Sequence, residues 1–346
     1  MSDSIIRRYG LVFFTIALLI AFSIASPEIF ATGSNLAFIL QVNGALAVLA
    51  LGSIVPLAAG EFDLTVGAVA GLSAIIVARL GQAGVPFFAS LIVAILVGVV
   101  VGLVNSFVVS ALHVSSLITT LGTMSVVGGL TLFLTGGSIV SLGVPEGLVS
   151  FMQQSLWNVP LSMIIVAIVA VILWYLLNRT PLGRSLYAMG MNRDAAVLMG
   201  SRVKRNVTIC FIISGVAATI AGVMLLGSQQ AASPALGGNL LLPALAVAFL
   251  GASTIQPGWF NVLGTLVAVF MVGASIIGLQ SVGVPYWVEP IFFGGVLIVA
   301  VAVSATSSGP VRQLLHRLFG RRSPEEPVFA EVEVSSESNV ASGDRT

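Results

Sequence analysis

The sequence predicts an all-α polytopic membrane protein, a helical bundle of about ten transmembrane spans with both termini in the cytoplasm. Three observations predict this fold class. Hydrophobic residues make up 57% of the 346 residues, charged residues make up only 8%, and the apolar residues fall into ten long segments. A soluble domain carries charge on about a quarter of its residues, because its surface faces water. Lipid is therefore expected to cover most of this surface.

The ten apolar segments supply the expected spans, because a helix needs about 20 apolar residues to cross the hydrocarbon core of a bilayer. In chain order they cover residues 11–25, 36–59, 64–80, 87–112, 116–135, 157–178, 207–227, 240–256, 260–279 and 286–305. The first, third and eighth are the shortest, and the third and eighth are candidates for broken helices. The 37 glycines suit close contact between such helices.

Basic residues predict the orientation, since Lys and Arg are enriched in cytoplasmic loops. Of the 14 basic residues, all but Arg79 lie in three regions. These are the N-terminus (Arg7, Arg8), the central loop (Arg179, Arg184, Arg193, Arg202, Lys204, Arg205) and the tail (Arg312, Arg317, Arg321, Arg322, Arg345). All three regions are cytoplasmic only if six spans precede the central loop and four follow it, which agrees with the apolar segments.

This topology divides the chain into a cytoplasmic N-terminus (residues 1–10), a transmembrane domain (11–305) with a cytoplasmic loop at 178–206, and a cytoplasmic tail (306–346). The tail is rich in Ser, Glu and Pro and has no helical apolar period, so most of it is expected to be disordered. Its first part, Pro310 to Phe319, alternates Leu and Phe with Arg and His, which is typical of a short helix at the membrane surface.

Two absences bear on the energy source. The one lysine, Lys204, is followed by Arg205, whereas a nucleotide-binding P-loop needs Lys followed by Ser or Thr after a Gly-rich turn. The spans also hold almost no ionisable residues, which carriers driven by ion gradients usually keep in the membrane. Both absences favour a passage whose energy comes from another subunit. The sequence predicts no catalytic residues, no metal site and no cofactor.

Residues 60–67, GEFDLTVG, are the one place where two carboxylates stand between apolar spans. Asp63 precedes an apolar helix and can cap its free backbone N–H groups. Gly60 and Gly67 permit a tight turn and close packing, and Glu61 and Thr65 complete the element. Two interpretations stay open: a capped connection between helices, or a broken-helix element that lines a path or touches a partner.

The central loop is too polar to span a membrane and too patterned for a plain linker. Asn192 can cap a helix at Arg193–Met199, with Asp194 in the first turn and Gly200 at the end. The face expected to be exposed carries five small or apolar residues: Ala195, Ala196, Val197, Leu198 and Met199. Such a helix suits either insertion into a groove of another protein or a position on the lipid surface.

Four uncharged hydrogen-bonding residues lie within or beside the spans and are candidates for contact with a hydroxylated solute: Gln41, Asn43, Asn105 and Gln229. The alternative is that they hydrogen-bond one helix to another. A faint internal similarity links Ala47–Gly67 with Ala246–Gly264, either as a parallel repeat or by chance between apolar sequences.

With these elements together, the chain resembles permease subunits of bacterial ABC importers of the ribose, xylose, arabinose and galactose type. The family's Gly-Gly-Ile-Asp-Leu-Ser-Val-Gly element appears as GEFDLTVG. Its Thr-x-x-Gly-Arg, Tyr-Ala-x-Gly-x-Asn and Ala-Ala-x-x-x-Gly patterns appear within residues 180–200. The likeness covers about residues 36–305, and related permeases for branched-chain amino acids and nucleosides share the general plan.

The resemblance implies a non-enzymatic, multi-pass permease of the bacterial inner membrane that forms the translocation path for a small polar solute, in the first place a monosaccharide. The implied partners are a cytoplasmic ABC ATPase, a second permease subunit (identical or different), a periplasmic or lipid-anchored solute-binding protein and membrane lipid, with no nucleic acid. By position, the helix that couples to the ATPase would comprise Gly190, Asn192, Arg193, Asp194, Ala195, Ala196 and Gly200.

The sequence also departs from this family. Glu61 and Phe62 replace the usual Gly and Ile, and Pro243-Ala244 stands where ribose-type permeases commonly carry an acidic residue. The identity of the solute therefore stays open. Competing functions are an importer of branched-chain amino acids or nucleosides, a stand-alone secondary transporter or channel, which the lack of intramembrane charge disfavours, and a membrane scaffold.

Overall fold

Residues 2–306 are described by the computed structural model, with side chains from residue 8 to 302. The expectations for the tail and for a surface helix at Pro310 to Phe319 therefore lie outside the described residues, as do the side chains of Arg7 and of the basic residues beyond Pro310. The helices are α1 (Ser2–Ala25), α2 (Gly33–Ala58), α3 (Thr65–Gln82), α4 (Phe87–Ala111), α5 (Ser116–Thr135), α6 (Glu146–Gln153), α7 (Ser162–Arg179), α8 (Pro181–Met191), α9 (Arg193–Leu198), α10 (Val203–Gln229), α11 (Gly238–Gly251), α12 (Val262–Ser281) and α13 (Val288–Thr306). The strands β1 (Ser155–Leu156) and β2 (Val159–Pro160) form a small antiparallel hairpin.

The all-α membrane fold is confirmed, and each of the ten expected spans overlaps one of these helices. Within residues 2–306, eight helices are long and apolar enough to cross a membrane, while the apolar stretches Gly238–Gly251 and Val288–Ala302 are shorter. A count of about ten spans and the cytoplasmic position of the termini stay predictions. Two predictions were wrong: α3 is one continuous helix and not a broken one, and the sixth span begins at Ser162 because the hairpin occupies residues 155–160.

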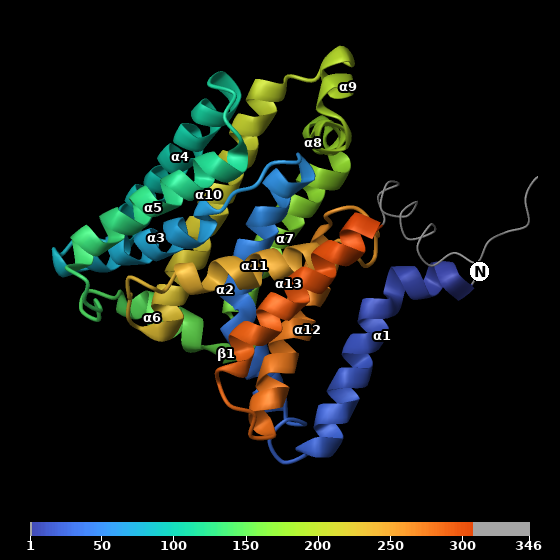
Figure 1. Ribbon diagram of the computed structural model, residues 1–346. Helices are drawn as coiled ribbons and strands as arrows, with labels where there is room; N and C mark the ends of the chain where they lie inside the picture. The colour runs from blue at the N-terminus through green and yellow to red at the C-terminus, as the bar shows by residue number, and fades with distance from the viewer. Residues whose placement is uncertain (1, 307–346) are drawn as a thin grey trace, which may run out of the picture. The chain divides into compact units, whose positions relative to one another are not determined.

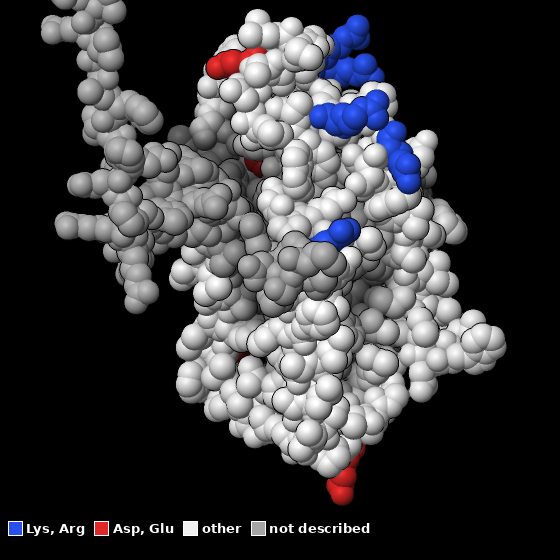
Figure 2. All heavy atoms as spheres, turned by 90° about the vertical axis from the view of Figure 1, so that its right-hand side faces the viewer, with Lys and Arg blue, Asp and Glu red and all other residues white. Residues whose placement is uncertain are grey.

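One end of the bundle, called here the basic end, is formed by α8, α9 and the start of α10. It carries the Lys and Arg side chains of residues 179–205 (Figure 2). The turn between α11 and α12 joins this end, because the Tyr187 hydroxyl of α8 donates to the Phe260 carbonyl. The N-terminal segment joins that turn, because the Arg8 carbonyl accepts a hydrogen bond from the Ile255 N–H at 2.8 Å.

The connections at the opposite end also contact one another. Val140, after α5, forms a two-way backbone bridge with Ala232, after α10. The Gln82 side chain, at the end of α3, donates to the Leu142 carbonyl at 3.1 Å. Successive connections thus alternate between two ends of the helical unit, as expected for helices that cross a membrane in turn.

Helix α10 lies at the centre and packs against α4, α2 and α3 (Figure 1). Small residues allow this close packing. A Cβ built on Gly215 would lie 2.3 Å from the Gly98 carbonyl oxygen, and one on Gly222 would lie 2.0 Å from the Ala70 carbonyl oxygen. Since lipid gives helices no hydrophobic drive to associate, such backbone contacts supply the van der Waals packing that holds them together.

The two segments of the proposed repeat share a local arrangement. Each runs from a helix through an irregular turn into a second helix, α2 to α3 and α11 to α12. At equivalent places, an Asp63 carboxylate oxygen accepts from the Thr65 N–H, and the Asn261 amide oxygen accepts from the Gly264 N–H. Both side chains satisfy backbone donors that the start of a helix leaves free.

Candidate functional site

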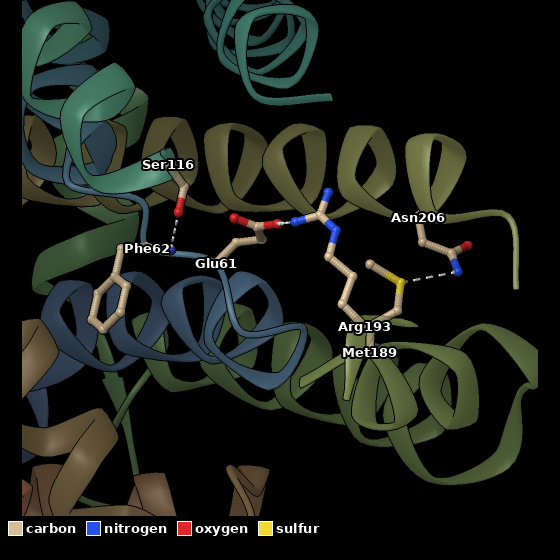
Figure 3. A network of polar contacts seen from close by, with 6 residues as sticks. All are labelled: Glu61, Phe62, Ser116, Met189, Arg193 and Asn206. Carbon is tan, nitrogen blue, oxygen red and sulfur yellow. Dashed lines mark hydrogen bonds and ion pairs between the residues drawn. The ribbon is translucent and has the colours of Figure 1, made fainter. Parts of the chain in front are cut away.

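The two sequence elements singled out above, residues 60–67 and 190–200, meet at the basic end. Arg193 Nη1 donates to Glu61 Oε1 at 2.6 Å across 132 residues of sequence (Figure 3). The backbones also touch, since a Cβ built on Gly190 would lie 2.3 Å from the Ala58 carbonyl oxygen. The turn after α2 and the α8–α9 segment therefore form one structural junction.

The turn at residues 59–64 is shaped by a glycine. Gly60 has a φ of +78°, a conformation that side-chain-bearing residues rarely adopt. The N–H groups of Gly60 and Glu61 donate back to the carbonyls of Leu57 and Pro56, which closes the end of α2. Reversal of the chain at this point sends the Glu61 side chain toward α9.

The Glu61–Arg193 pair is unequally exposed: the side chain of Glu61 is 6% exposed and that of Arg193 is 46% exposed. It is the one ion pair within the described part of the chain. A buried carboxylate is costly unless a positive group and hydrogen bonds compensate for the lost water. Arg193 therefore supplies compensation that Glu61 needs in this position.

Asp63, two residues further, lies in a separate buried polar cluster. Its carboxylate accepts hydrogen bonds from the Thr65 N–H, the Thr65 hydroxyl and the Ser214 hydroxyl of α10. The Asn105 side chain of α4 extends the cluster by donating to the Thr65 hydroxyl at 3.2 Å, while its own Oδ1 is buried without a partner. Burial raises the pKa of the Asp63 carboxyl, and the three hydrogen bonds oppose that rise.

Phe62, between the two acids, ties the turn to α5 and α11. Its N–H donates to the Ser116 hydroxyl at 3.1 Å (Figure 3), and its carbonyl accepts from the Thr120 hydroxyl at 3.3 Å. Its ring stacks on Phe249 with centroids 6.4 Å apart. Three consecutive side chains thus point to three different parts of the bundle.

The expected capping of the short helix in the central loop is present in α9. The Asn192 side chain accepts from the Ala195 N–H at 2.9 Å, Asp194 lies in the first turn, and Gly200 follows the helix with a φ of +82°. Ala195 is exposed, but Ala196 is buried, so the expectation that both alanines are exposed was wrong. Ala196 faces inward because it packs into the same core cluster as Leu186 and Val207.

The end of α9 presents apolar side chains outward. Val197, Leu198 and Met199 are 53%, 88% and 89% exposed. We call these three residues the apolar tip. Exposed apolar groups of this kind, held at the end of a capped helix among basic residues, are typical of a contact surface for another protein or for lipid.

A polar network that the sequence did not predict fixes α8 and the residues after α9 to the start of α10. The Asn206 amide donates to the Met189 sulfur (Figure 3). It also donates to the hydroxyls of Ser185 and Ser201. Thr180 caps α8 by accepting from the Gly183 N–H. The Thr-Pro step at 180–181 is the sequence signal that could have revealed α8, because Thr is a common N-cap and Pro a common first helical residue.

A groove of about 680 Å³ opens beside the ion pair. It runs between the turn at residues 60–62, the α4–α5 connection, α9 and the start of α10. Its polar lining includes Glu61, His113, Ser115, Arg193 and Lys204.

The four candidate solute contacts do not lie together. Gln41 donates to the Met152 carbonyl of α6, and Asn43 donates to Ile39 within α2 and lies against Gly273 of α12. Asn105 belongs to the Asp63 cluster, and Gln229 is exposed at the end of α10. Three of the four therefore make helix-to-helix or local contacts within this chain.

Comparison with known proteins gives consistent results. The family described as the permease component of the branched-chain amino acid transport system matches residues 35–301. The chain is 34% identical to the D-allose transport system permease protein of Escherichia coli (strain K12) over 298 residues, 86% of this chain and 91% of that protein. It is 30% identical to the autoinducer 2 import system permease protein of Yersinia enterocolitica over 333 residues, 92% of this chain and 98% of that protein.

A second autoinducer 2 import system permease protein, from Photorhabdus luminescens, is 29% identical over 309 residues, 85% of this chain and 91% of that protein. No solved structure matches the chain. The family match covers most of the sequence and includes both elements of the junction. The chain therefore belongs to the family of permease components of the branched-chain amino acid transport system.

Proposed function

We propose that this chain forms the translocation path of an ABC importer for a monosaccharide or a sugar-like solute, and that a separate ATPase docks on α9. Permeases of this family are multi-pass proteins of the bacterial inner membrane and are not enzymes themselves. They work with an ATPase and a solute-binding protein. The relatives that carry D-allose and autoinducer 2 in their names support a small polar solute over an amino acid.

The observation that carries the ATPase contact is the apolar tip of α9. Val197, Leu198 and Met199 are exposed although the helix beneath them is capped and anchored. An apolar surface that is rigidly presented among basic side chains suits insertion into a groove of a partner. In this role Gly190, Asn192, Arg193, Asp194, Ala196 and Gly200 shape and hold the helix, while Ala195 lies on its exposed side.

The same proposal assigns the basic end to the cytoplasm, since Lys and Arg concentrate in cytoplasmic segments. Residues 1–10 and 178–206 are then cytoplasmic, and residues 11–305 form the permease domain with about ten crossings. The GEFDLTVG element, with Gly60, Glu61, Asp63, Thr65 and Gly67, lies at the cytoplasmic mouth beside the ATPase contact.

A complete path also needs a second permease subunit, identical or different, and a periplasmic or lipid-anchored binding protein that delivers solute. Among the four polar candidates, Asn105 is the best placed to act near the mouth, because it adjoins Asp63 and keeps an unpartnered oxygen. Gln229 is exposed at the opposite end, where a delivered solute would arrive.

Import of branched-chain amino acids is the second candidate, and the description of the matching family favours it. The two candidates differ in the solute that the binding protein retains. Direct binding of D-allose, D-ribose or leucine to the purified binding protein separates them.

The energy source is tested by uptake of the retained solute in cells that carry the permease, the ATPase and the binding protein. Uptake should stop when cellular ATP is depleted by arsenate and continue when a protonophore collapses the proton gradient. A strain without the permease sets the background. The reverse pattern would identify a secondary carrier and overturn the proposal.

A further inference from the structure

The turn at residues 60–63 is bonded to three other helices, whereas capping of α3 would need a bond to α3 alone. Glu61 pairs with Arg193 of α9, Phe62 is hydrogen-bonded to Ser116 at the start of α5, and Asp63 accepts a hydrogen bond from Ser214 of α10. A displacement of α9 that moved Arg193 would therefore act directly on a turn that is fixed to α3, α5 and α10.

Glu61 is the member of this turn that reaches the α9 segment by its side chain. A second contact between the two segments is the backbone approach of Gly190 to Ala58 and Gly60, and Gly190 lies on α8 rather than α9. The Asn206 network holds α8 and the residue after α9 to the start of α10, and none of its members contacts the turn by a hydrogen bond. Among the described residues, the ion pair is thus the one side-chain hydrogen bond between α9 and residues 60–63.

The surroundings of the ion pair allow Arg193 to move more freely than Glu61. The groove beside it carries His113 and Lys204 together with Arg193, and Glu61 is its acidic side chain. Glu61 is nearly buried while Arg193 is half exposed, so Arg193 can move in the groove while Glu61 stays fixed in the turn. Loss of the pair leaves a buried carboxylate without its cation, which favours re-formation of the contact.

We infer that Glu61 and Arg193 are positioning residues that transmit movement of α9 to the turn at 60–63, and so link ATP hydrolysis to opening of the path. This inference rests on the proposed function, because it assumes that an ATPase moves α9. It goes beyond the family motif, because the motif carries Gly where this chain carries Glu61. A Gly at that position has no side chain with which to reach Arg193.

The test uses the complete importer, with permease, ATPase and binding protein reconstituted in proteoliposomes. Glu61→Gln, Arg193→Gln and the double variant are compared with wild type, and Arg202→Gln is the matched control for loss of a positive charge next to α9. Assembly is measured by co-purification of the ATPase, and coupling by the number of ATP molecules hydrolysed for each solute transported.

Each single variant should still co-purify with the ATPase, while transport falls more than ATP hydrolysis does, so that the ratio of ATP hydrolysed to solute transported rises at least fivefold. Since the two residues act as a unit, the double variant should match the single variants and not multiply their effects. Glu61→Asp and Arg193→Lys, which keep the charges, should retain part of the coupling that the Gln variants lose.

Two results would overturn the inference. One is a ratio in both single variants equal to that of Arg202→Gln. The other is loss of ATPase co-purification in Glu61→Gln, which would make the pair a support for docking only. Failure of the proposed function looks different, because wild-type permease itself would then neither retain the ATPase nor transport in an ATP-dependent way.

Discussion

Gly190 of α8 lies against the Ala58 carbonyl at the end of α2, and a Cβ built on Gly190 would lie 2.3 Å from that oxygen. Real Cβ atoms do not approach an oxygen so closely, so any side chain at position 190 must push α8 away from α2. The contact sets the distance across which Arg193 reaches Glu61. Packing and charge in the junction therefore depend on each other.

Gly190→Ala should destabilise the junction and weaken the coupling of ATP hydrolysis to transport. Overpacking of a tight contact costs about 1–3 kcal/mol. The apparent unfolding temperature of the purified protein in detergent should fall, and uptake should fall with it. Gly147→Ala is the matched control, because Gly147 lies in α6 with open space around its Cβ position. Equal unfolding temperatures for the two variants would contradict the contact.

Asp63→Ala should lower stability by removing the acceptor of a buried cluster. The Thr65 and Ser214 hydroxyls and the Thr65 N–H would lose their shared partner, and each buried group left unpaired costs about 1–3 kcal/mol. Thermal unfolding in detergent measures the loss. Asp63→Asn, which keeps one acceptor oxygen, should fall between wild type and Asp63→Ala.

The control for the Asp63 variants is Ser125→Ala, since the exposed Ser125 hydroxyl bonds only to a carbonyl of its own helix. This variant should unfold at the wild-type temperature. An Asp63→Ala protein as stable as Ser125→Ala would show that the cluster contributes nothing to the fold.

Ala195→Arg should block the ATPase contact and leave the permease folded. Ala195 is exposed, so a long charged side chain fits the isolated chain but obstructs a partner's groove. Co-purification of the ATPase should be lost, and ATP-driven uptake with it. Ala83→Arg, an exposed alanine at the opposite end, should retain both. Ala196 is unsuitable for this test, because it is buried and a charged side chain at its position would disturb folding.

Orientation is open to direct labelling, because the chain has one cysteine, the buried Cys210. In a Cys210→Ala background, Leu142→Cys and Leu198→Cys place exposed thiols at opposite ends of the bundle. A membrane-impermeant maleimide should label position 142 in cells whose inner membrane is intact. It should label position 198 only after that membrane is opened. Labelling of position 198 in intact cells would reverse the proposed topology.

Hydrophobicity was enough to predict where the helices lie. The expected segment 116–135 coincides with α5, and 87–112 ends one residue beyond α4, because only long apolar stretches can be buried in lipid. The helix α6 and the hairpin after it escaped notice, since they are short and lie between spans. Helix α8 was not predicted either, because its polar residues lack the apolar run that marks a span.

The caps of the site could also be predicted, because Asn192 acts on a backbone group three residues away. The distant contacts could not, namely Glu61 with Arg193, Asp63 with Ser214 and Asn105 with Thr65. Each contact joins residues that are 40 or more positions apart, and the register between packed helices decides which side chains meet. The inward turn of Ala196 depends in the same way on the core beneath α9.

The central claim is that this permease takes its energy from a separate ATPase through α9. It is tested most directly in proteoliposomes that hold purified permease with or without the ATPase, in the presence of solute-loaded binding protein. We expect accumulation of solute against its gradient only when the ATPase and ATP are both present, and none when the permease carries Ala195→Arg. Accumulation by the permease alone would contradict the claim.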